Sequence, residues 1–348
     1  MKAIKDYLET CVAGGAFPGA AWAIGGKETL ETGAVGLLGA GLEAVAEDSL
    51  YDLASLTKLF TTLALMKQLE DGLIRLEDRV DYFLPAFRDS PLGGTTLFRL
   101  LTHTAPLPGG TMLYRYAHTR EDLLEAIRST GIRRDEGALY TCEAFILLGE
   151  IASAADSAGL DELIRERVTA PLGMTETGYN PPAEKITRIA PTEVCPRQGA
   201  ALRGHVHDEN AAILGGVSGN AGIFSTVRDM DRLAATVLDS LEGRGDFLRR
   251  PTAILMTSNL TRGKGENRGL GWMLKGPLSA AGDLMAEESF GHTGFTGTSL
   301  WIDPSRRLYA VLLSNRIHPR RDNAGIFRVR HIFHNLAILR YGGGIQGA

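Results

Sequence analysis

Ser55 and Lys58 are the two residues whose types and spacing point most directly to chemistry in this chain of 348 residues. They are three positions apart, and residues at that separation are neighbours on a helix surface. A serine hydroxyl is a weak nucleophile until a nearby base takes its proton, and a neutral lysine amine can do so. Arginine cannot, because it stays protonated in proteins. The pair therefore predicts attack by a serine on a carbonyl carbon.

The helix that would carry this pair is predicted from the apolar pattern of residues 59–69. The pattern stops at Asp71 and Gly72, which are typical of a helix C-terminus. Ser55 would then open the helix, where the dipole favours the negative charge that develops during the attack. The plainer interpretation is a helix cap followed by a surface lysine. Other motifs must decide between the two.

Both ends of the chain are predicted to form β-hairpins, because extended apolar runs flank residues typical of turns. The paired strands are expected at 19–24 with 29–35 and at 298–302 with 308–313. An amphipathic helix is expected at the N-terminus. A second one is expected over 326–339, with His331 and His334 on its polar side.

These elements predict an α/β fold of the α+β type, with a mainly antiparallel sheet built from both termini, flanking helices and a large helical insertion. We assign residues 1–58 and 265–348 to the sheet domain, and residues 59–264 to a mainly helical domain. The active site would lie in the cleft between them.

The composition argues against several classes of protein. Hydrophobic residues make up 44% of the chain and charged residues 22%, which is typical of a globular protein in solution. A net charge of -4 without a basic stripe argues against a nucleic-acid partner. The three cysteines are far apart and odd in number, so we expect reduced thiols. Charges interrupt the N-terminal segment, which predicts no signal peptide and no membrane span. We therefore expect a cytoplasmic protein, or a periplasmic one if a leader has been trimmed from this sequence.

Two further segments carry residues that a serine–lysine pair needs. Tyr140 precedes an apolar helix that would begin near Cys142, and residues 292–294 read His-Thr-Gly at the entry to the last hairpin. Each segment also has a structural interpretation. Tyr140 could be an aromatic residue that precedes a core helix. The histidine could lie at the end of a strand and have no functional role. Cys142 could be a small buried side chain that fills space in the core.

With these segments in this order, the sequence resembles the serine hydrolase family that contains class C β-lactamases, D-alanyl-D-alanine carboxypeptidases and esterases of the β-lactamase fold. That family carries Ser-x-x-Lys, then Tyr-x-Asn, then Lys-Thr-Gly or His-Thr-Gly. The corresponding positions here are Ser55 to Lys58, Tyr140 to Cys142 and His292 to Gly294. The likeness also covers residues 96–104 and 222–226, so it spans nearly the whole chain.

The resemblance implies that Ser55 attacks an ester or amide while Lys58 and Tyr140 share the proton transfers. Burial and nearby cations would lower the pKa of Lys58, and a nearby ammonium would leave Tyr140 partly ionised. The backbone N–H groups of Ser55 and Phe295 would form the oxyanion hole, and Gly294 would let the backbone approach. The mechanism requires no cofactor and no metal.

Two positions depart from the family pattern. Cys142 stands where relatives usually carry asparagine, and a thiol is a weaker partner than an amide for an acylamino group. His292 replaces lysine, so a substrate carboxylate would be held less firmly near neutral pH. His292 and Thr293 would still bind substrate from the sheet side, and His292 could hydrogen-bond Tyr140 or a substrate carboxylate. These changes disfavour an efficient β-lactamase or a strict carboxypeptidase, and they leave an esterase or a broad acyl hydrolase.

Residues 205–208 and the glycine-rich run 214–222 are the remaining candidates for the site. His205 and His207 would share one face of a strand and could ligate a metal, although no further ligand cluster is evident. The favoured interpretation is a loop that lines the cleft, with His207 or Asp208 contacting the substrate or the helical lobe. Asn220 is a further cleft-lining candidate. The glycine-rich run lacks the ending of a phosphate-binding loop.

The sequence therefore predicts a serine acyl hydrolase that forms an acyl-enzyme on Ser55 and is most similar to an esterase. Its substrate would be a small ester, amide or β-lactam. A D-alanyl-D-alanine carboxypeptidase or weak β-lactamase is the first alternative. A non-catalytic ligand-binding module of the same fold is the second.

Overall fold

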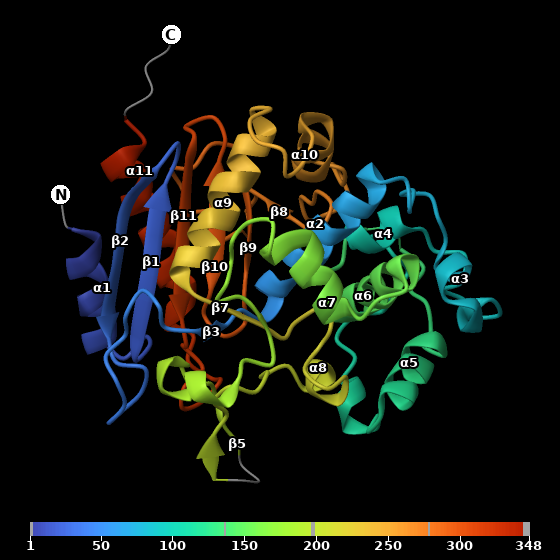
Figure 1. Ribbon diagram of the computed structural model, residues 1–348, viewed down its shortest axis with the longest axis horizontal. Coiled ribbons are helices and arrows are strands. Elements are labelled where there is room, and N and C mark those ends of the chain that lie inside the picture. The colour runs from blue at the N-terminus through green and yellow to red at the C-terminus, as the bar shows by residue number, and fades with distance from the viewer. Residues whose placement is uncertain (1–2, 136, 196–198, 278, 344–348) are drawn as a thin grey trace.

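The main sheet combines strands from both ends of the chain, as the computed structural model shows (Figure 1). Its order is β2-β1-β11-β10-β9-β8, and all neighbours are antiparallel. The strands are β1 (Gly19–Gly25), β2 (Thr29–Gly36), β8 (Met273–Leu274), β9 (Phe290–Thr293), β10 (Ser299–Asp303) and β11 (Leu308–Ser314). This arrangement confirms the predicted fold class and both hairpins. The structure describes residues 3–135, 137–195, 199–277 and 279–343.

Helices cover both faces of this sheet. α1 (Ile4–Ala13) and α11 (Gly325–Tyr341) pack on one face, and α9 (Val227–Leu241) packs against β1 and β11 on the other (Figure 1). Successive strand residues point to opposite faces. Trp22 therefore joins the core under α1 and α11, while its neighbour Ala21 joins the core on the α9 side.

The last helix corrects one prediction. We expected His334 on the polar side of α11, yet its side chain is completely buried. Its Nε2 atom lies 3.3 Å from Ser299 Oγ on β10, and burial lowers its pKa to about 3. His331 is half-buried. The prediction failed because α11 packs on the sheet over a face that includes the polar residues Arg330 and His334, four positions apart.

The remaining part of the chain is mainly helical. Its α-helices are α2 (Thr57–Glu70), α3 (Val80–Phe83), α4 (Leu97–Leu101), α5 (Arg120–Arg128), α6 (Cys142–Asp156), α7 (Leu160–Ile164), α8 (Glu209–Ile213) and α10 (Arg250–Thr257). Shorter helical turns are η1 (Ala54–Leu56), η2 (Pro85–Phe87), η3 (Leu113–Arg115), η4 (Arg165–Thr169) and η5 (Ala183–Arg188). Within the described ranges, none of the helices has the length and apolar character that crossing a membrane requires.

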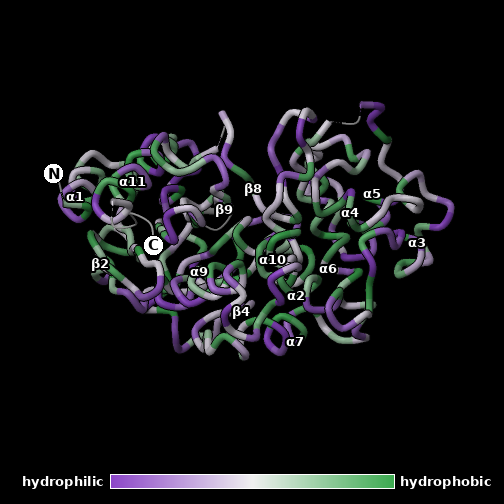
Figure 2. The backbone as a smooth tube through the Cα atoms, turned by 90° about the horizontal axis from the view of Figure 1, so that it is seen from above, coloured by the Kyte–Doolittle hydropathy of each residue, from purple (hydrophilic) through white to green (hydrophobic). Residues whose placement is uncertain are grey.

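α2 forms the centre of the helical part. It ends at Glu70, with Asp71 as its cap and Gly72 at a φ of +74°, as the sequence predicted. Most of its residues are buried all round the helix, which identifies it as a core helix. Figure 2 shows hydrophobic segments gathered where α2, α6 and α10 meet.

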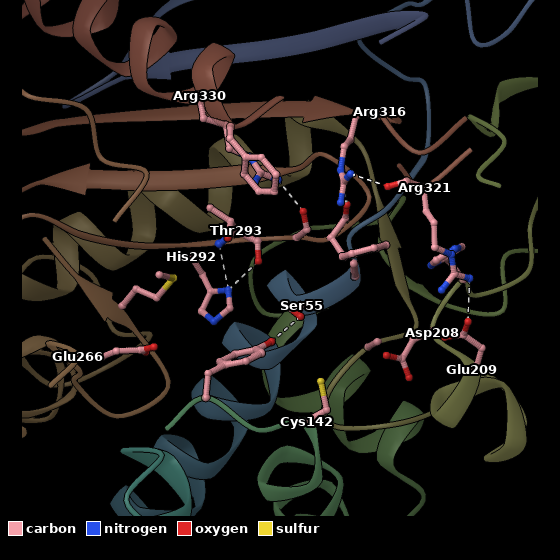
Figure 3. A pocket seen from close by; sticks show the side chains of 18 of the residues that line it. Ser55, Cys142, Asp208, Glu209, Glu266, His292, Thr293, Arg316, Arg321 and Arg330 are labelled. Carbon is pink, nitrogen blue, oxygen red and sulfur yellow. Dashed lines mark hydrogen bonds and ion pairs between the residues drawn. The ribbon is translucent and has the colours of Figure 1, made fainter. Parts of the chain in front are cut away.

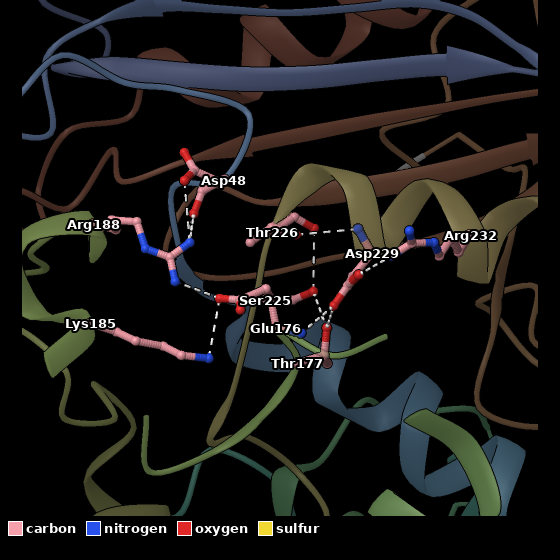
Figure 4. A network of polar contacts seen from close by, with 9 residues as sticks. All are labelled: Asp48, Glu176, Thr177, Lys185, Arg188, Ser225, Thr226, Asp229 and Arg232. Carbon is pink, nitrogen blue, oxygen red and sulfur yellow. Dashed lines mark hydrogen bonds and ion pairs between the residues drawn. The ribbon is translucent and has the colours of Figure 1, made fainter. Parts of the chain in front are cut away.

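A small sheet connects the helical part to the segment before Ser55. It has the order β3-β7-β4, with β3 (Tyr51–Asp52), β4 (Gly178–Tyr179) and β7 (Ile223–Ser225), and a separate pair joins β5 (Val194–Cys195) to β6 (Ala200–Ala201). Beside this sheet, Asp229 accepts hydrogen bonds from the Glu176 N–H and the Thr177 hydroxyl, at 2.9 and 2.8 Å (Figure 4). This network fixes the start of α9 against the segment that precedes β4.

Candidate active site

Ser55 lies in a tight turn between β3 and α2. The turn is η1, and Ala54 within it has a φ of +48°, a conformation that costs an L-residue about 1–3 kcal/mol. Asp52 stabilises the turn, because one carboxylate oxygen accepts the Ala54 N–H and the other accepts the His207 N–H, each at 2.8 Å. The turn places the Ser55 side chain at the wall of a pocket (Figure 3).

Side chains from separate segments meet at the Ser55 hydroxyl. Tyr140 Oη lies 2.6 Å from Ser55 Oγ, and Lys58 Nζ lies 3.1 Å from it. Lys58 Nζ also donates to the Asn220 carbonyl at 3.0 Å and lies 3.8 Å from Cys142 Sγ. The structure therefore brings Ser55, Lys58 and Tyr140 together, as the sequence motifs required.

Lys58 is fully buried, and its three contacts match the three N–H donors of an ammonium group. Burial acts to lower the pKa of Lys58, but the ionisable Cys142 and Tyr140 outweigh it and the pKa is raised. The expected lowering is therefore wrong. Burial also raises the pKa of Tyr140, although Lys58 opposes that shift, so the expected partial ionisation is wrong too. Both shifts favour an ammonium on Lys58 and a neutral phenol on Tyr140 near neutral pH.

His103 supports Tyr140. The two ring centroids are 4.9 Å apart. His103 Nδ1 accepts the Thr141 N–H at 3.2 Å, and the His103 carbonyl accepts the Leu139 N–H at 2.8 Å. One residue thus accepts the N–H groups of both chain neighbours of Tyr140, Leu139 and Thr141. Burial keeps the pKa of His103 well below its usual value, so the ring stays neutral and Nδ1 remains an acceptor.

The turn after β9 packs directly on the segment before Ser55. Thr296 Oγ1 donates to the Asp52 carbonyl at 2.7 Å, and Thr298 Oγ1 donates to the Leu53 carbonyl at 3.0 Å. Glycine is required at position 294, because a Cβ atom there would lie 2.4 Å from the Leu53 oxygen. The close approach expected for Gly294 is therefore present.

Two backbone N–H groups beside the pocket have no acceptor. Within the part of the chain that is described, neither the Ser55 N–H nor the Phe295 N–H donates to a protein atom. Both residues line the same pocket. Such unpaired amides are what an oxyanion hole is made of.

His292 contributes a neutral imidazole. Its Nδ1 lies 3.0 Å from the Thr293 nitrogen and 2.9 Å from the Thr293 carbonyl oxygen, so it accepts from the N–H in one tautomer and donates to the carbonyl in the other. Nε2 is buried and has no hydrogen-bond partner among the described residues. Burial, together with the charge of Arg268, lowers the pKa of His292 well below its usual value, so the ring carries no charge near neutral pH. No hydrogen bond joins it to Tyr140 in the described chain; their ring centroids are 6.0 Å apart.

The pocket has a volume of about 510 Å³, and most of the predicted site residues line it. These are Ser55, Tyr140, Cys142, His207, Asp208, His292, Thr293, Gly294 and Phe295. Lys58 and Asn220 are buried beside it. His205 is exposed, and His207 Nε2 lies 3.0 Å from Glu193 Oε2. The segment 205–207 forms a bend and no strand, so it lacks the strand geometry required by the metal-site interpretation.

Four arginines that line the pocket were not predicted: Arg268, Arg316, Arg321 and Arg330. Arg268 is 3% exposed, lies 5.3 Å from the centre of the Tyr140 ring, and has a buried Nη1 atom without a partner in the described chain. These arginines come from loops and from α11 at no recurring spacing. No local sequence pattern could have identified them.

Comparison with known proteins agrees with this geometry. The family model described as Beta-lactamase matches residues 4–333. The chain belongs to the β-lactamase family. The members of this family with this fold are serine hydrolases, which confirms the resemblance seen in the motifs. A relative in Escherichia coli (strain K12), named “Putative D-alanyl-D-alanine carboxypeptidase”, is 33% identical over 303 residues, which cover 78% of this chain and 70% of that protein.

Two solved structures share the fold. One is a hydrolase with promiscuous acyltransferase activity, 20% identical, with a TM-score of 0.74 over 94% of this chain and 97% of that one. Another is the β-lactamase/D-alanine carboxypeptidase from Pseudomonas syringae, 20% identical, with a TM-score of 0.75 over 95% and 98%. At this identity the likeness establishes the fold alone.

Proposed function

We propose that this β-lactamase family protein is a serine acyl hydrolase of the esterase type, with Ser55 as its nucleophile. The observation that carries the proposal is the 2.6 Å contact between Ser55 Oγ and Tyr140 Oη beside the Lys58 amine. The site would lie between the two domains, because Tyr140 belongs to the helical domain and His292 to the sheet domain.

In acylation, Ser55 Oγ attacks the carbonyl carbon of the ester. Its proton passes to the Lys58–Tyr140 pair, which has first lost one proton to solvent. The N–H groups of Ser55 and Phe295 bind the oxyanion, and each such donor contributes about 3 kcal/mol. The pair then protonates the leaving oxygen as its bond to carbon breaks, which leaves the acyl group on Ser55.

In deacylation, the same pair takes a proton from water as the water attacks the acyl carbonyl. Collapse of the second tetrahedral intermediate breaks the bond to Ser55 Oγ, which recovers its proton, and releases the acid. Two features favour an ester over a β-lactam. Cys142 supplies no amide for an acylamino group, and His292 carries no charge for a carboxylate.

Intact-mass spectrometry with a panel of activated esters and β-lactams tests the proposal. We expect a mass increase equal to the acyl group with esters such as p-nitrophenyl butyrate, and none in Ser55→Ala. Turnover of esters without labelling by a fluorescent penicillin would support the esterase. An absence of both labelling and hydrolysis above the Ser55→Ala control would instead indicate a non-catalytic binding module.

One observation favours a D-alanyl-D-alanine carboxypeptidase as the second candidate. Arg268 Nη1 and His292 Nε2 are buried nitrogens without partners in the described chain, and both residues line the pocket; Nε2 is a donor in the tautomer in which Nδ1 accepts the Thr293 N–H. Two such donors suit the two oxygens of a carboxylate. The 33% identical relative carries the name of that activity. Release of D-alanine from a peptide that ends in D-alanyl-D-alanine would support this candidate over the esterase.

A further inference from the structure

Arg330 of α11 contacts the turn that carries the Phe295 N–H. Its guanidinium is buried, and Nη2 donates to the Gly294 carbonyl at 2.5 Å and to the Thr298 carbonyl at 2.7 Å. These carbonyls lie at the two ends of the turn between β9 and β10. One cation, labelled in Figure 3, therefore fixes both ends of the turn.

The Gly294 carbonyl and the Phe295 N–H belong to the same peptide group. A hydrogen bond from a cation to the carbonyl oxygen draws electron density from the peptide nitrogen and makes its N–H a stronger donor. The Gly294 carbonyl also accepts the Gly297 N–H at 3.1 Å, which adds to the same polarisation. The Phe295 N–H itself has no acceptor in the described chain, so it stays available to a ligand.

A second arginine fixes the next peptide. Arg316 is buried, its Nε donates to the Phe295 carbonyl at 2.9 Å, and its guanidinium lies 4.5 Å from the Phe295 ring centroid. The turn is thus held by arginines on one side. On the other side, the hydroxyls of Thr296 and Thr298 hold it to the segment before Ser55.

We propose that Arg330 is a positioning residue that orients and polarises the Gly294–Phe295 peptide, so that the Phe295 N–H binds the oxyanion of the tetrahedral intermediate more strongly than an ordinary amide would. The inference rests on the proposed function. Because it concerns charge that develops during the reaction, it affects kcat and leaves ground-state binding of the ester nearly unchanged.

The test compares Arg330→Gln and Arg330→Lys with the wild-type protein on p-nitrophenyl butyrate. Arg328→Gln is the control, because Arg328 is an exposed arginine on the same helix. Loss of a whole oxyanion donor costs about 100-fold to 1000-fold in kcat. Arg330 acts through a peptide group that remains in the variants. We therefore expect kcat to fall about 10-fold to 100-fold in Arg330→Gln and less in Arg330→Lys, with KM within about twofold of the wild-type value.

A spectroscopic readout separates this role from a merely structural one. The infrared carbonyl band of the acyl-enzyme, made with a carbon-13 carbonyl, reports the hydrogen bonds from the oxyanion hole. We expect the band at higher frequency in both Arg330 variants than in wild type, and unchanged in Arg328→Gln. Melting temperatures show whether each variant is folded.

A wild-type band position and kcat in folded Arg330→Gln would overturn the inference. If that variant does not fold, Arg330→Lys decides by the same criteria, since it keeps a cation at the buried site. The proposed function fails separately, if the wild-type protein itself forms no acyl-enzyme on Ser55.

Discussion

Ser55 Oγ lies 2.6 Å from Tyr140 Oη, although 85 residues separate them in the sequence. Lys58 Nζ is within 3.1 Å of the same serine oxygen. The serine therefore has two proton carriers, and the raised pKa values of both disfavour their proton-accepting forms near neutral pH. The resting charge state of this pair governs several measurable properties.

Replacing Lys58 should remove most of the hydrolysis. We expect Lys58→Met to lower kcat/KM for p-nitrophenyl butyrate by about 100-fold to 10,000-fold, the range for a general acid–base group. Lys67→Met is the matched control, since Lys67 lies on the same helix and bonds to Phe247 and Glu70 away from the pocket. Equal rates for Lys58→Met and wild type would contradict the proposed role of the lysine.

Hydrolysis should become faster as the pH rises above neutral. The raised pKa values of Lys58 and Tyr140 mean that the proton-accepting form of the pair is scarce near pH 7 and grows with pH. We expect kcat/KM to climb from about pH 7 to about pH 9. His292 should add no inflection near its usual pKa, because its pKa lies well below that range. A pH profile that is flat above about pH 7 would show that the pair is already deprotonated at rest.

Substitutions of His103 should separate its hydrogen bond from its bulk. His103→Leu leaves the buried Thr141 N–H without an acceptor, which costs about 1–3 kcal/mol in the free energy of unfolding. It should also lower kcat by loosening Tyr140. His103→Asn supplies an oxygen near the position of Nδ1, and asparagine tolerates the φ of +56° at this position. This variant should therefore retain more of the stability and more of kcat than His103→Leu. Denaturant unfolding and ester kinetics check this, and equal losses in the two variants would count against the hydrogen bond.

Arg268 should distinguish carboxylated substrates from neutral ones. Arg268→Gln removes the guanidinium that has a free buried Nη1 atom. A hydrogen bond to a charged group contributes about 1.5–3 kcal/mol. The measurement compares kcat/KM for an ester whose leaving group carries a carboxylate with kcat/KM for the corresponding methyl ester. We expect the ratio of the first to the second to fall about 10-fold to 100-fold in Arg268→Gln. An unchanged ratio would show that the substrate carboxylate binds away from Arg268, or that the protein does not act on carboxylated substrates.

Cys142→Asn should increase acylation by β-lactams. Asparagine at this position offers an amide to the acylamino group and a carbonyl oxygen to Lys58, and one such hydrogen bond contributes about 0.5–1.5 kcal/mol. The second-order rate constant for labelling by a fluorescent penicillin should rise by up to about tenfold. Cys142→Ser serves as the control of similar size without the amide. If both variants label at the same rate, the missing amide is not the reason that Cys142 limits acylation by β-lactams.

The sequence predicted those parts of the structure that depend on local patterns. The strands of both hairpins and the helix after Ser55 have periodic apolar residues and turn residues at their ends. The spacing of Ser55 and Lys58 encodes their proximity within one turn of a helix. The order of the family motifs added Tyr140 and His292, which local spacing alone would not have joined.

What the sequence could not predict depends on contacts between distant segments. Arg268 and Arg330 sit in no motif, and their place at the pocket follows only from the folded chain. The charge of Lys58 depends on burial and on Cys142 and Tyr140, which lie more than 80 residues away. His334 was misplaced because helical periodicity shows which residues share a face, but not how wide a face the sheet covers.

The threonine bonds from the turn after β9 to the Asp52 and Leu53 carbonyls have a further consequence. They make the nucleophile turn and the turn at Phe295 a single rigid unit. Changes in the outlying loops can then reshape the pocket for new substrates without separating these two amides. A scaffold of this kind can diversify in specificity during evolution while it preserves one reaction.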